Sequence, residues 1–327
     1  MNKMISLLLF FAASVSAAQK PVPIIFDTDI APDYDDVGAI TLLHAFADRG
    51  EARILATISS NAFETTAATL SVFNTYFNRP DIPVGVTRGP QPNKACGQQW
   101  AQAILQQYPH AIRSNDQAWE AVQLYRKILA SAPDTSVVII TVGFFTNLAH
   151  LLASKPDGYS PMSGRELVIK KVKRLVSMAA RIDQQGPGGY EFNVMVDAAA
   201  SRKVFSEWPT PVIISGFEIG EKILTGIRLI HNDSIRNSPV KDAFRVALAK
   251  DNNSVGRNSW DETAVLVAVR GIEPCFGYRM LNLAVMEDGK DVVIPGERFA
   301  YLTFKQTPEQ LAIIIEDLMM HQPEKNK

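Results

Sequence analysis

Five aspartates lie close together near the beginning of the chain, directly after a short run of apolar, β-branched residues. They belong to the segment FDTDIAPDYDD and are Asp27, Asp29, Asp33, Asp35 and Asp36. Carboxylates this close repel one another unless a cation or raised pKa values relieve the charge. Calcium suits such a cluster, because it takes about six to eight oxygen ligands and tolerates irregular geometry. The segment therefore predicts a site for a hard divalent cation. The alternative is a solvated acidic loop at a helix N-terminus, which the helix dipole favours.

The elements around this segment predict where its side chains lie. Strands are predicted at residues 22–26, 53–58, 83–86, 137–142, 174–178 and 211–214, and helices at residues 35–48, 65–77, 116–130, 146–153 and 197–208. Such alternation is typical of an α/β protein with a mostly parallel open sheet and helices on both faces, here in a single domain. Active sites of these sheets lie beyond the carboxyl ends of the strands, where the acidic segment falls.

The last third of the chain is less regular. A helix is predicted at residues 258–269, strands near residues 280–285 and 298–303, and a closing helix at residues 308–320, before a polar tail at 324–327.

Three later segments accompany the acidic loop. They are ITVGFFTNLA at residues 140–149, YEFNVMVD at residues 190–197 and SWDETA at residues 259–264. With Asp27-Thr28-Asp29 and Asp35-Asp36, and with Ala31 in place of a Gly, they occur in the order found in the inosine-uridine-preferring nucleoside hydrolases, which this chain resembles. The resemblance extends over nearly the whole mature chain. It implies a nucleoside hydrolase-like domain at residues 19–327 that hydrolyses the N-glycosidic bond of ribonucleosides to ribose and free base, with Ca²⁺ as cofactor.

The resemblance also implies roles for individual residues. Calcium would be bound by four groups, namely Asp29, Asp36, Asp261 and the main-chain carbonyl of Val142. Asp29 would also act as the general base toward water. Ribose hydroxyls would be bound by Asp35, Asn61, Glu191 and Asn193. Gln185 lies where the family often has another ribose-binding Asn. Without the resemblance, Glu191 and Asn193 would be taken for a polar loop after a Gly-rich turn.

The residue expected to assist the leaving base differs here from that in many members of the family. Those members place a His before the last calcium-binding Asp as a proton donor, whereas this chain has Trp260. An indole is not an acid at neutral pH, but it can stack on a base, as in purine-preferring relatives. Purine ribonucleosides are therefore expected ahead of pyrimidine ones; the alternative is that Trp260 belongs to the core. None of the five His residues lies in a matched motif.

Composition and the N-terminus limit the partners and the location. The chain has 33 Lys and Arg against 34 Asp and Glu, which removes the electrostatic argument for a nucleic-acid or anionic-membrane partner and favours a small-molecule nucleoside.

Residues 1–18 have the pattern of a cleavable signal peptide, which predicts a secreted or periplasmic protein. Cys96 and Cys275 either pair or stay free, and a homo-oligomer is left open.

Two functions of other classes remain alternatives. Haloacid-dehalogenase-like, magnesium-dependent phosphatases also begin with a strand and Asp-x-Asp, but usually continue into Gly-Thr, whereas this chain continues into Ile30-Ala31. A non-catalytic extracytoplasmic nucleoside- or sugar-binding protein is the second alternative, because Ala31 and Trp260 could mark a site that has lost activity.

Overall fold

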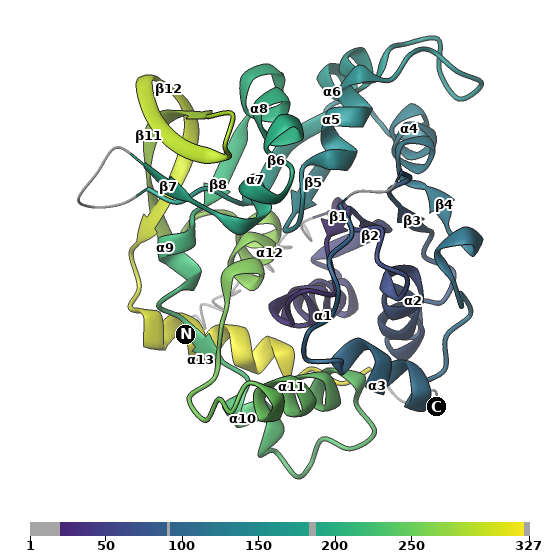
Figure 1. Cartoon of the computed structure of the whole chain (residues 1–327), viewed down its shortest axis with the longest axis vertical. Helices are drawn as coiled ribbons and strands as arrows, with labels where there is room; N and C mark the ends of the chain where they lie inside the picture. The colour runs from purple at the N-terminus through teal and green to yellow at the C-terminus, as the bar shows by residue number, and fades with distance from the viewer. Residues whose placement is uncertain (1–19, 90–91, 183–187, 324–327) are drawn as a thin grey trace, which may run out of the picture.

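Ten strands of the described residues form one central sheet. A computed structural model describes residues 20–89, 92–182 and 188–323 (Figure 1). The strands are β1 Val22–Thr28, β2 Ala52–Ser59, β3 Val84–Val86, β4 Trp119–Glu120, β5 Val137–Thr141, β6 Val172–Met178, β7 Gly188–Tyr190, β8 Val212–Ser215, β11 Phe276–Val285 and β12 Lys290–Phe304. Their order is β11-β12-β8-β6-β5-β1-β2-β3-β4, with β7 beside β12.

The pairing is parallel from β12 through β8 to β4, and antiparallel only where β12 meets β11 and β7. The central strand β5 is VVIIT and is buried along its whole length, as a parallel strand covered on both faces must be. The predicted mostly parallel sheet is confirmed.

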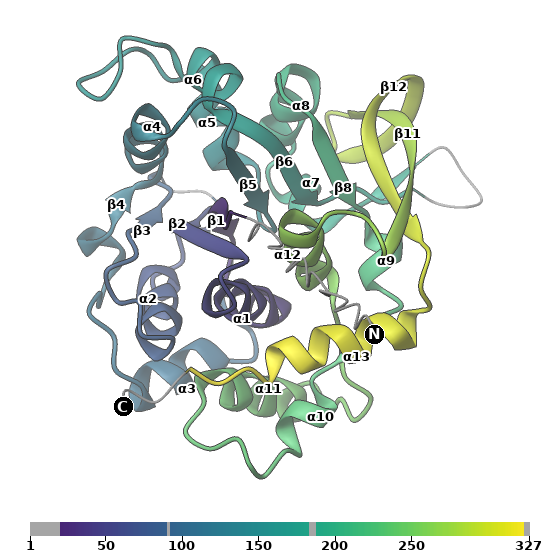
Figure 2. The ribbon, with the colours of Figure 1, turned by 180° about the vertical axis from the view of Figure 1, so that it is seen from behind.

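Helices cover both faces of this sheet, as the two opposite views show (Figures 1 and 2). The longer ones are α1 Asp35–Asp48, α2 Thr66–Tyr76, α3 Trp100–Gln107, α4 Ala121–Ser131, α5 Thr146–Ala153, α6 Gly164–Lys171, α8 Ala198–Glu207, α11 Pro239–Lys250, α12 Trp260–Arg270 and α13 Pro308–Met319. In β1, Ile24 and Phe26 belong to the core layer that contains buried residues of α1, α2, α12 and α13, while Ile25 between them belongs to the layer with α4, α5, α6 and α8. The alternation of a strand thus divides the core into two layers.

Shorter elements complete the chain. They are α7 Phe192–Val196, α9 Phe217–Gly220, α10 Ile227–Ile230, a 3-10 turn at Asn115–Gln117, and a separate two-stranded sheet of β9 Leu224–Thr225 and β10 Arg257–Asn258.

The main departure from the predicted elements concerns α4. A helix was expected from residue 116, but α4 begins at Ala121. The side chain of Glu120 accepts hydrogen bonds from the main-chain nitrogens of Val122 and Gln123, and Trp119 and Glu120 pair with β3 as β4. The helices α3, α6 and α11 were not predicted. A capping box of Ser163 and Glu166 at α6 was a sequence signal that could have found that helix.

Several sequence predictions lie outside the described residues: the signal peptide, Gln185 and the polar tail at 324–327. Within the described residues, no helix is long and apolar enough to cross a membrane. Cys96 and Cys275 are both buried and free, so the structure does not pair them.

The order of the sheet reverses direction at its centre. From β1 the chain proceeds through β2, β3 and β4 toward one edge, then returns to β5 on the other side of β1 and proceeds toward the opposite edge. Crevices for ligands form at such a reversal, outside the carboxyl ends of the two strands. Asp29 follows β1, and Val142 follows β5.

Candidate active site

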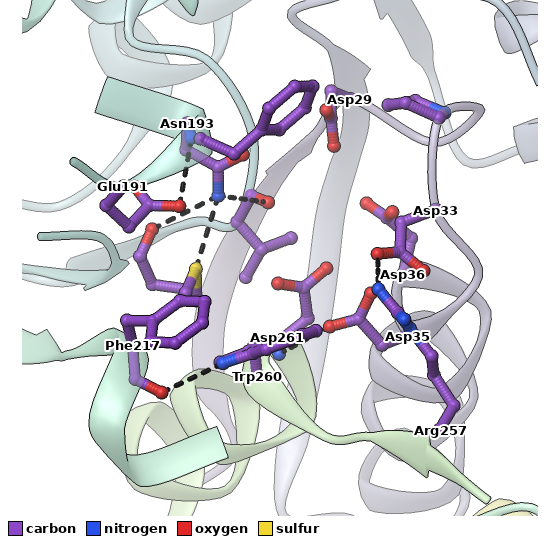
Figure 3. Close-up of a pocket in the computed structure, with 14 residues that line it drawn as sticks. Asp29, Asp33, Asp35, Asp36, Glu191, Asn193, Phe217, Arg257, Trp260 and Asp261 are labelled. Carbon is purple, nitrogen blue, oxygen red and sulfur yellow. Dashed lines mark hydrogen bonds and ion pairs between the residues drawn. The ribbon is translucent and has the colours of Figure 1, made fainter. Parts of the chain in front are cut away.

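A cavity of about 280 Å³ lies at this reversal point (Figure 3). Six carboxylates line it, namely Asp29, Asp33, Asp35, Asp36, Glu191 and Asp261. Its other lining residues are Pro32, Val142, Met178, Phe192, Asn193, Phe217, Arg257 and Trp260. The four segments singled out in the sequence thus meet around one cavity, with the acidic loop and the segment at residues 190–193 on facing sides.

Three of the carboxylates converge closely enough to share a cation. Each of Asp35, Asp36 and Asp261 offers a carboxylate oxygen within 4.8 Å of the others, and all three are buried. Asp35 and Asp36 begin α1, and Asp261 lies in the first turn of α12, which packs along α1. Gly38 of α1 leaves room for the buried side chain of Glu262 of α12, because a Cβ at Gly38 would lie 2.0 Å from its carboxylate oxygen.

Local hydrogen bonds orient the converging carboxylates. The hydroxyl of Thr28 and the main-chain nitrogen of Ile30 donate to Asp36, the latter over 3.3 Å. The main-chain nitrogen of Asp261 donates to Asp35 over 3.2 Å, which ties the two helix N-termini together.

Burial and mutual repulsion disfavour the ionised form of the aspartates in this cavity. Burial, followed by repulsion from neighbouring carboxylates, raises the pKa values of Asp29, Asp35 and Asp261 well above the usual range. Burial also raises the pKa of Asp36 to about 7. Buried hard oxygen donors with raised pKa values are the donor set that a hard divalent cation takes. The residues present therefore fit the predicted cation, with Asp35 nearer to the shared position than the sequence implied.

Asp29 stands outside this trio but lines the same cavity, and its carboxylate points toward the trio (Figure 3). Its position depends on close contact between the ends of β1 and β5. A Cβ at Gly143 would lie 2.3 Å from the main-chain nitrogen of Asp29 and 2.7 Å from Oγ of Ser60. Gly143 is therefore needed where the strand ends meet.

Replacing Gly143 by Ala should displace Asp29. Overpacking at a tight position typically costs about 1–3 kcal/mol of stability, and a shift of the reacting geometry by about 1 Å can reduce turnover by roughly 10²-fold. Thermal melting and steady-state kinetics measure the two effects. Gly158→Ala is the matched control, because nothing lies within 4 Å of a Cβ there. Equal behaviour of the two variants would contradict this role of Gly143.

Glu191 and Asn193 form the facing wall. The carboxylate of Glu191 caps α7 by accepting hydrogen bonds from the main-chain nitrogens of Asn193 (2.9 Å) and Val194 (3.1 Å), and burial raises its pKa to about 7. Nδ2 of Asn193 donates to the carbonyl oxygen of Val142 over 3.1 Å, so the predicted calcium-binding carbonyl also anchors this wall.

The side chain of Asn61 does not line the cavity, although a ribose contact was predicted for it. Its Nδ2 donates to the carbonyls of Asp29 (3.0 Å) and Lys94 (2.8 Å), and its Oδ1 accepts from the main-chain nitrogens of Phe63 and Lys94. The amide is thus fully used in holding the loop after β2 against Asp29. Asp197, the last residue of the segment YEFNVMVD, does not line the cavity either. Its carboxylate caps α8 and accepts a hydrogen bond from Thr146 over 2.5 Å.

An aromatic and cationic corner completes the cavity. Trp260 begins α12, lines the cavity and donates from Nε1 to the carbonyl of Phe217 over 2.9 Å. The rings of Trp260 and Phe217 lie 5.1 Å apart and inclined by 33°. Neither Phe217 nor Arg257 was predicted from the sequence. Phe217 could have been found, because it closely follows a predicted strand, whereas nothing local marked Arg257.

The comparison with known families decides the classification. Residues 24–315 match the family described as inosine-uridine preferring nucleoside hydrolase. The chain belongs to this family. The resemblance drawn from the four segments is therefore confirmed, and the nucleoside hydrolase assignment argues against the phosphatase alternative.

The similar proteins differ in the base for which they are named. A pyrimidine-specific ribonucleoside hydrolase RihA of Klebsiella pneumoniae is 27% identical over 217 residues, which is 61% of this chain and 61% of that protein. An inosine-guanosine nucleoside hydrolase has a TM-score of 0.70 at 17% identity, over 92% of this chain and 99% of the other. A purine-preferring ribonucleoside hydrolase of Gardnerella vaginalis has a TM-score of 0.68 at 15% identity, over 91% and 99%. The nucleoside hydrolase fold thus extends over nearly the whole chain.

Proposed function

We propose that this protein is a calcium-dependent enzyme that hydrolyses the N-glycosidic bond of ribonucleosides, purine ones faster than pyrimidine ones. One observation carries the proposal: Asp35, Asp36 and Asp261 converge beside Asp29 in a cavity whose facing wall is Glu191 and Asn193. These are the groups needed to hold a cation, a sugar and a water molecule in one place. Family membership supplies the class of reaction.

The cation would be held by Asp29, Asp36, Asp261 and the carbonyl of Val142, as the resemblance implies, with Asp35 converging on the same position. When bound, calcium supplies positive charge that makes water more acidic and attracts ribose hydroxyls. Side chains of this chain hold the sugar and accept the proton of the attacking water.

Breaking the ribosyl C–N bond leaves positive charge on the sugar and negative charge on the base. Asp35, Glu191 and Asn193 hold the ribose hydroxyls, and the surrounding carboxylates stabilise the positive sugar. Asp29 takes a proton from the attacking water, whose oxygen bonds to the anomeric carbon. Because missing hydroxyls leave buried polar groups unpaired, 2′-deoxynucleosides should be poor substrates.

Three aromatic side chains favour a purine as the leaving base. Phe192, Phe217 and Trp260 line the cavity and offer flat apolar surface to a bicyclic ring. The name of the Klebsiella relative gives the opposite expectation, so purines and pyrimidines must be compared directly.

Release of free base tests the proposal. Inosine, adenosine, uridine, cytidine and 2′-deoxyinosine are incubated with the protein, with and without a chelator, and base and reducing sugar are quantified. Release from the ribonucleosides that stops on chelation is expected. Saturable nucleoside binding without any release would instead establish the non-catalytic binding protein.

The raised pKa of Glu191 predicts how substrate binding depends on pH. The ionised carboxylate accepts hydrogen bonds from ribose more strongly than the neutral acid does, and burial raises its pKa to about 7. We therefore expect KM to rise as the pH falls below 7, by up to about tenfold per pH unit. Steady-state kinetics from pH 5 to 8 measures this. Glu191→Gln should bind ribonucleosides weakly without that pH dependence, and a constant wild-type KM would contradict the assignment.

We further propose that the protein acts outside the cytoplasm, which the signal-like residues 1–18 support. Mass measurement of the exported protein, with cleavage after Ala17 or Ala18, tests this.

A further inference from the structure

The cavity has a strong imbalance of charge. Of the described residues that line it, six carry a carboxyl group and only Arg257 carries a permanent positive charge. The cation expected at Asp35, Asp36 and Asp261 would neutralise the ribose side. Arg257 lies between Asp33 of the acidic loop and the ring of Trp260, the residue assigned to the base, so its charge borders both sides of the cavity (Figure 3).

Arg257 is held firmly in this position. It belongs to β10, where it pairs with Thr225 of β9, and its Nη2 forms an ion pair with Asp33. Asp33 is itself oriented by the main-chain nitrogen of Tyr34, which donates to its other oxygen over 2.7 Å.

Aromatic rings hold the guanidinium as well. Its central carbon lies 4.9 Å from the ring centre of Trp260 and 5.3 Å from that of Tyr34. Tyr34 is buried and packs edge-on against Phe244 of α11. A guanidinium stacked on aromatic rings and paired with a carboxylate is preorganised, so it needs to move little when charge develops nearby.

Arg257 also has hydrogen-bonding capacity to spare. Within the described part of the chain, Asp33 is the one acceptor found for its donors, and Nε is buried without a partner. Because Nε is enclosed, a ring stacked on Trp260 would meet the guanidinium through its Nη groups.

The proposed reaction needs a group of this kind. The base departs with the electron pair of the C–N bond, yet none of the His residues described lines the cavity, and an indole is not an acid at neutral pH. We propose that Arg257, positioned by Asp33, stabilises the negative charge that develops on the leaving base. This inference rests on the proposed function and identifies a group that assists the departure of the base.

The step balances without any further reactant. The C–N electron pair stays on the base nitrogen, the water oxygen bonds to the anomeric carbon, and the water proton passes to Asp29 and then to solvent. The base anion takes a proton from solvent after it leaves. Arg257 keeps its proton throughout, because a guanidinium does not deprotonate in proteins.

Two substrates with different leaving groups test the inference. Inosine must expel a poorly stabilised base anion, whereas 4-nitrophenyl β-D-ribofuranoside expels a phenolate that is stable unaided. Arg257→Gln should lower kcat for inosine by about 10²- to 10³-fold, as loss of a charge-stabilising donor does. For the nitrophenyl riboside we expect a loss of less than about tenfold, because little stabilisation is needed there. Arg257→Lys should recover part of the inosine activity.

A second arginine offers a matched control. The guanidinium of Arg181 lies 4.5 Å from the ring of Phe217 but does not line the cavity. Arg181→Gln therefore removes a cation from an aromatic ring without touching the base, and should leave both activities near wild type. Circular dichroism and thermal melting verify that each variant is folded.

The outcomes separate the inference from the proposed function. Loss by the same factor on both substrates, or a change confined to KM, would show that Arg257 only shapes the loop, and would overturn the inference alone. A wild-type protein that cleaves neither substrate would overturn the proposed function, and the role of Arg257 with it.

Discussion

Replacing Asp29 by Asn should lower kcat by about 10²- to 10⁴-fold, the usual contribution of a general base. The amide has nearly the same shape as the carboxylate but cannot take a proton from water. Asp29 is almost fully buried, and burial followed by repulsion from Asp36, Asp35 and Asp33 raises its pKa. Loss of this buried charge relieves repulsion, so the variant should fold at least as well as the wild type. Base release and thermal melting measure the two properties.

A matched control separates this role from a general effect of charge. Asp116→Asn removes a carboxylate whose side chain is 99% exposed, and should leave turnover unchanged. Nucleoside binding to Asp29→Asn, measured by calorimetry, should persist because Glu191 and Asn193 remain. Near-normal turnover in Asp29→Asn would remove Asp29 from the role of base.

Removal of divalent cations should reduce base release to background and make the metal-free fold sensitive to pH. In the metal-free protein, the pKa of Asp36 is raised from 3.8 to about 7, and those of Asp35 and Asp261 are raised well above the usual value. The folded state therefore holds protons that the unfolded chain releases. Stability is highest below the unfolded pKa and is lost as the pH rises toward the folded pKa.

Calcium should reverse this loss, because it replaces the missing protons as the source of positive charge. At a free concentration of 100 times its Kd, a ligand that binds only the folded state stabilises it by about 2.7 kcal/mol. The difference in melting temperature between calcium and chelator should thus widen from pH 5 to pH 8. A difference that is absent, or equal at both pH values, would contradict a cation at the carboxylate cluster.

Variants can localise the cation. Asp36→Asn and Asp261→Asn should each weaken calcium binding and narrow the difference in melting temperature, because each removes one converging oxygen donor. Asp317→Asn, which removes a half-exposed carboxylate on α13, is the control. Unchanged calcium affinity in both site variants would place the cation elsewhere.

The sequence by itself determined the class of fold and most of the cavity wall. Buried β-branched runs separated by helical stretches require a parallel sheet, and parallel strands bring their carboxyl ends to one edge. Asp29 could be placed at this edge because it follows a recognisable strand, whereas the resemblance to the nucleoside hydrolases placed Val142 and Glu191 beside it. Five neighbouring aspartates already required a cation or raised pKa values, whatever the rest of the chain did.

Only the tertiary structure decided which groups share the cation position and which face the base. The packing of α12 along α1 brings Asp261 beside Asp35 and Asp36. Asn61 follows a strand as the other site residues do, yet four hydrogen bonds to main-chain groups turn its amide away from the cavity. Arg257 meets Asp33 across 224 residues of sequence. Contacts between segments so far apart depend on how helices and loops pack, which local spacing and periodicity do not encode.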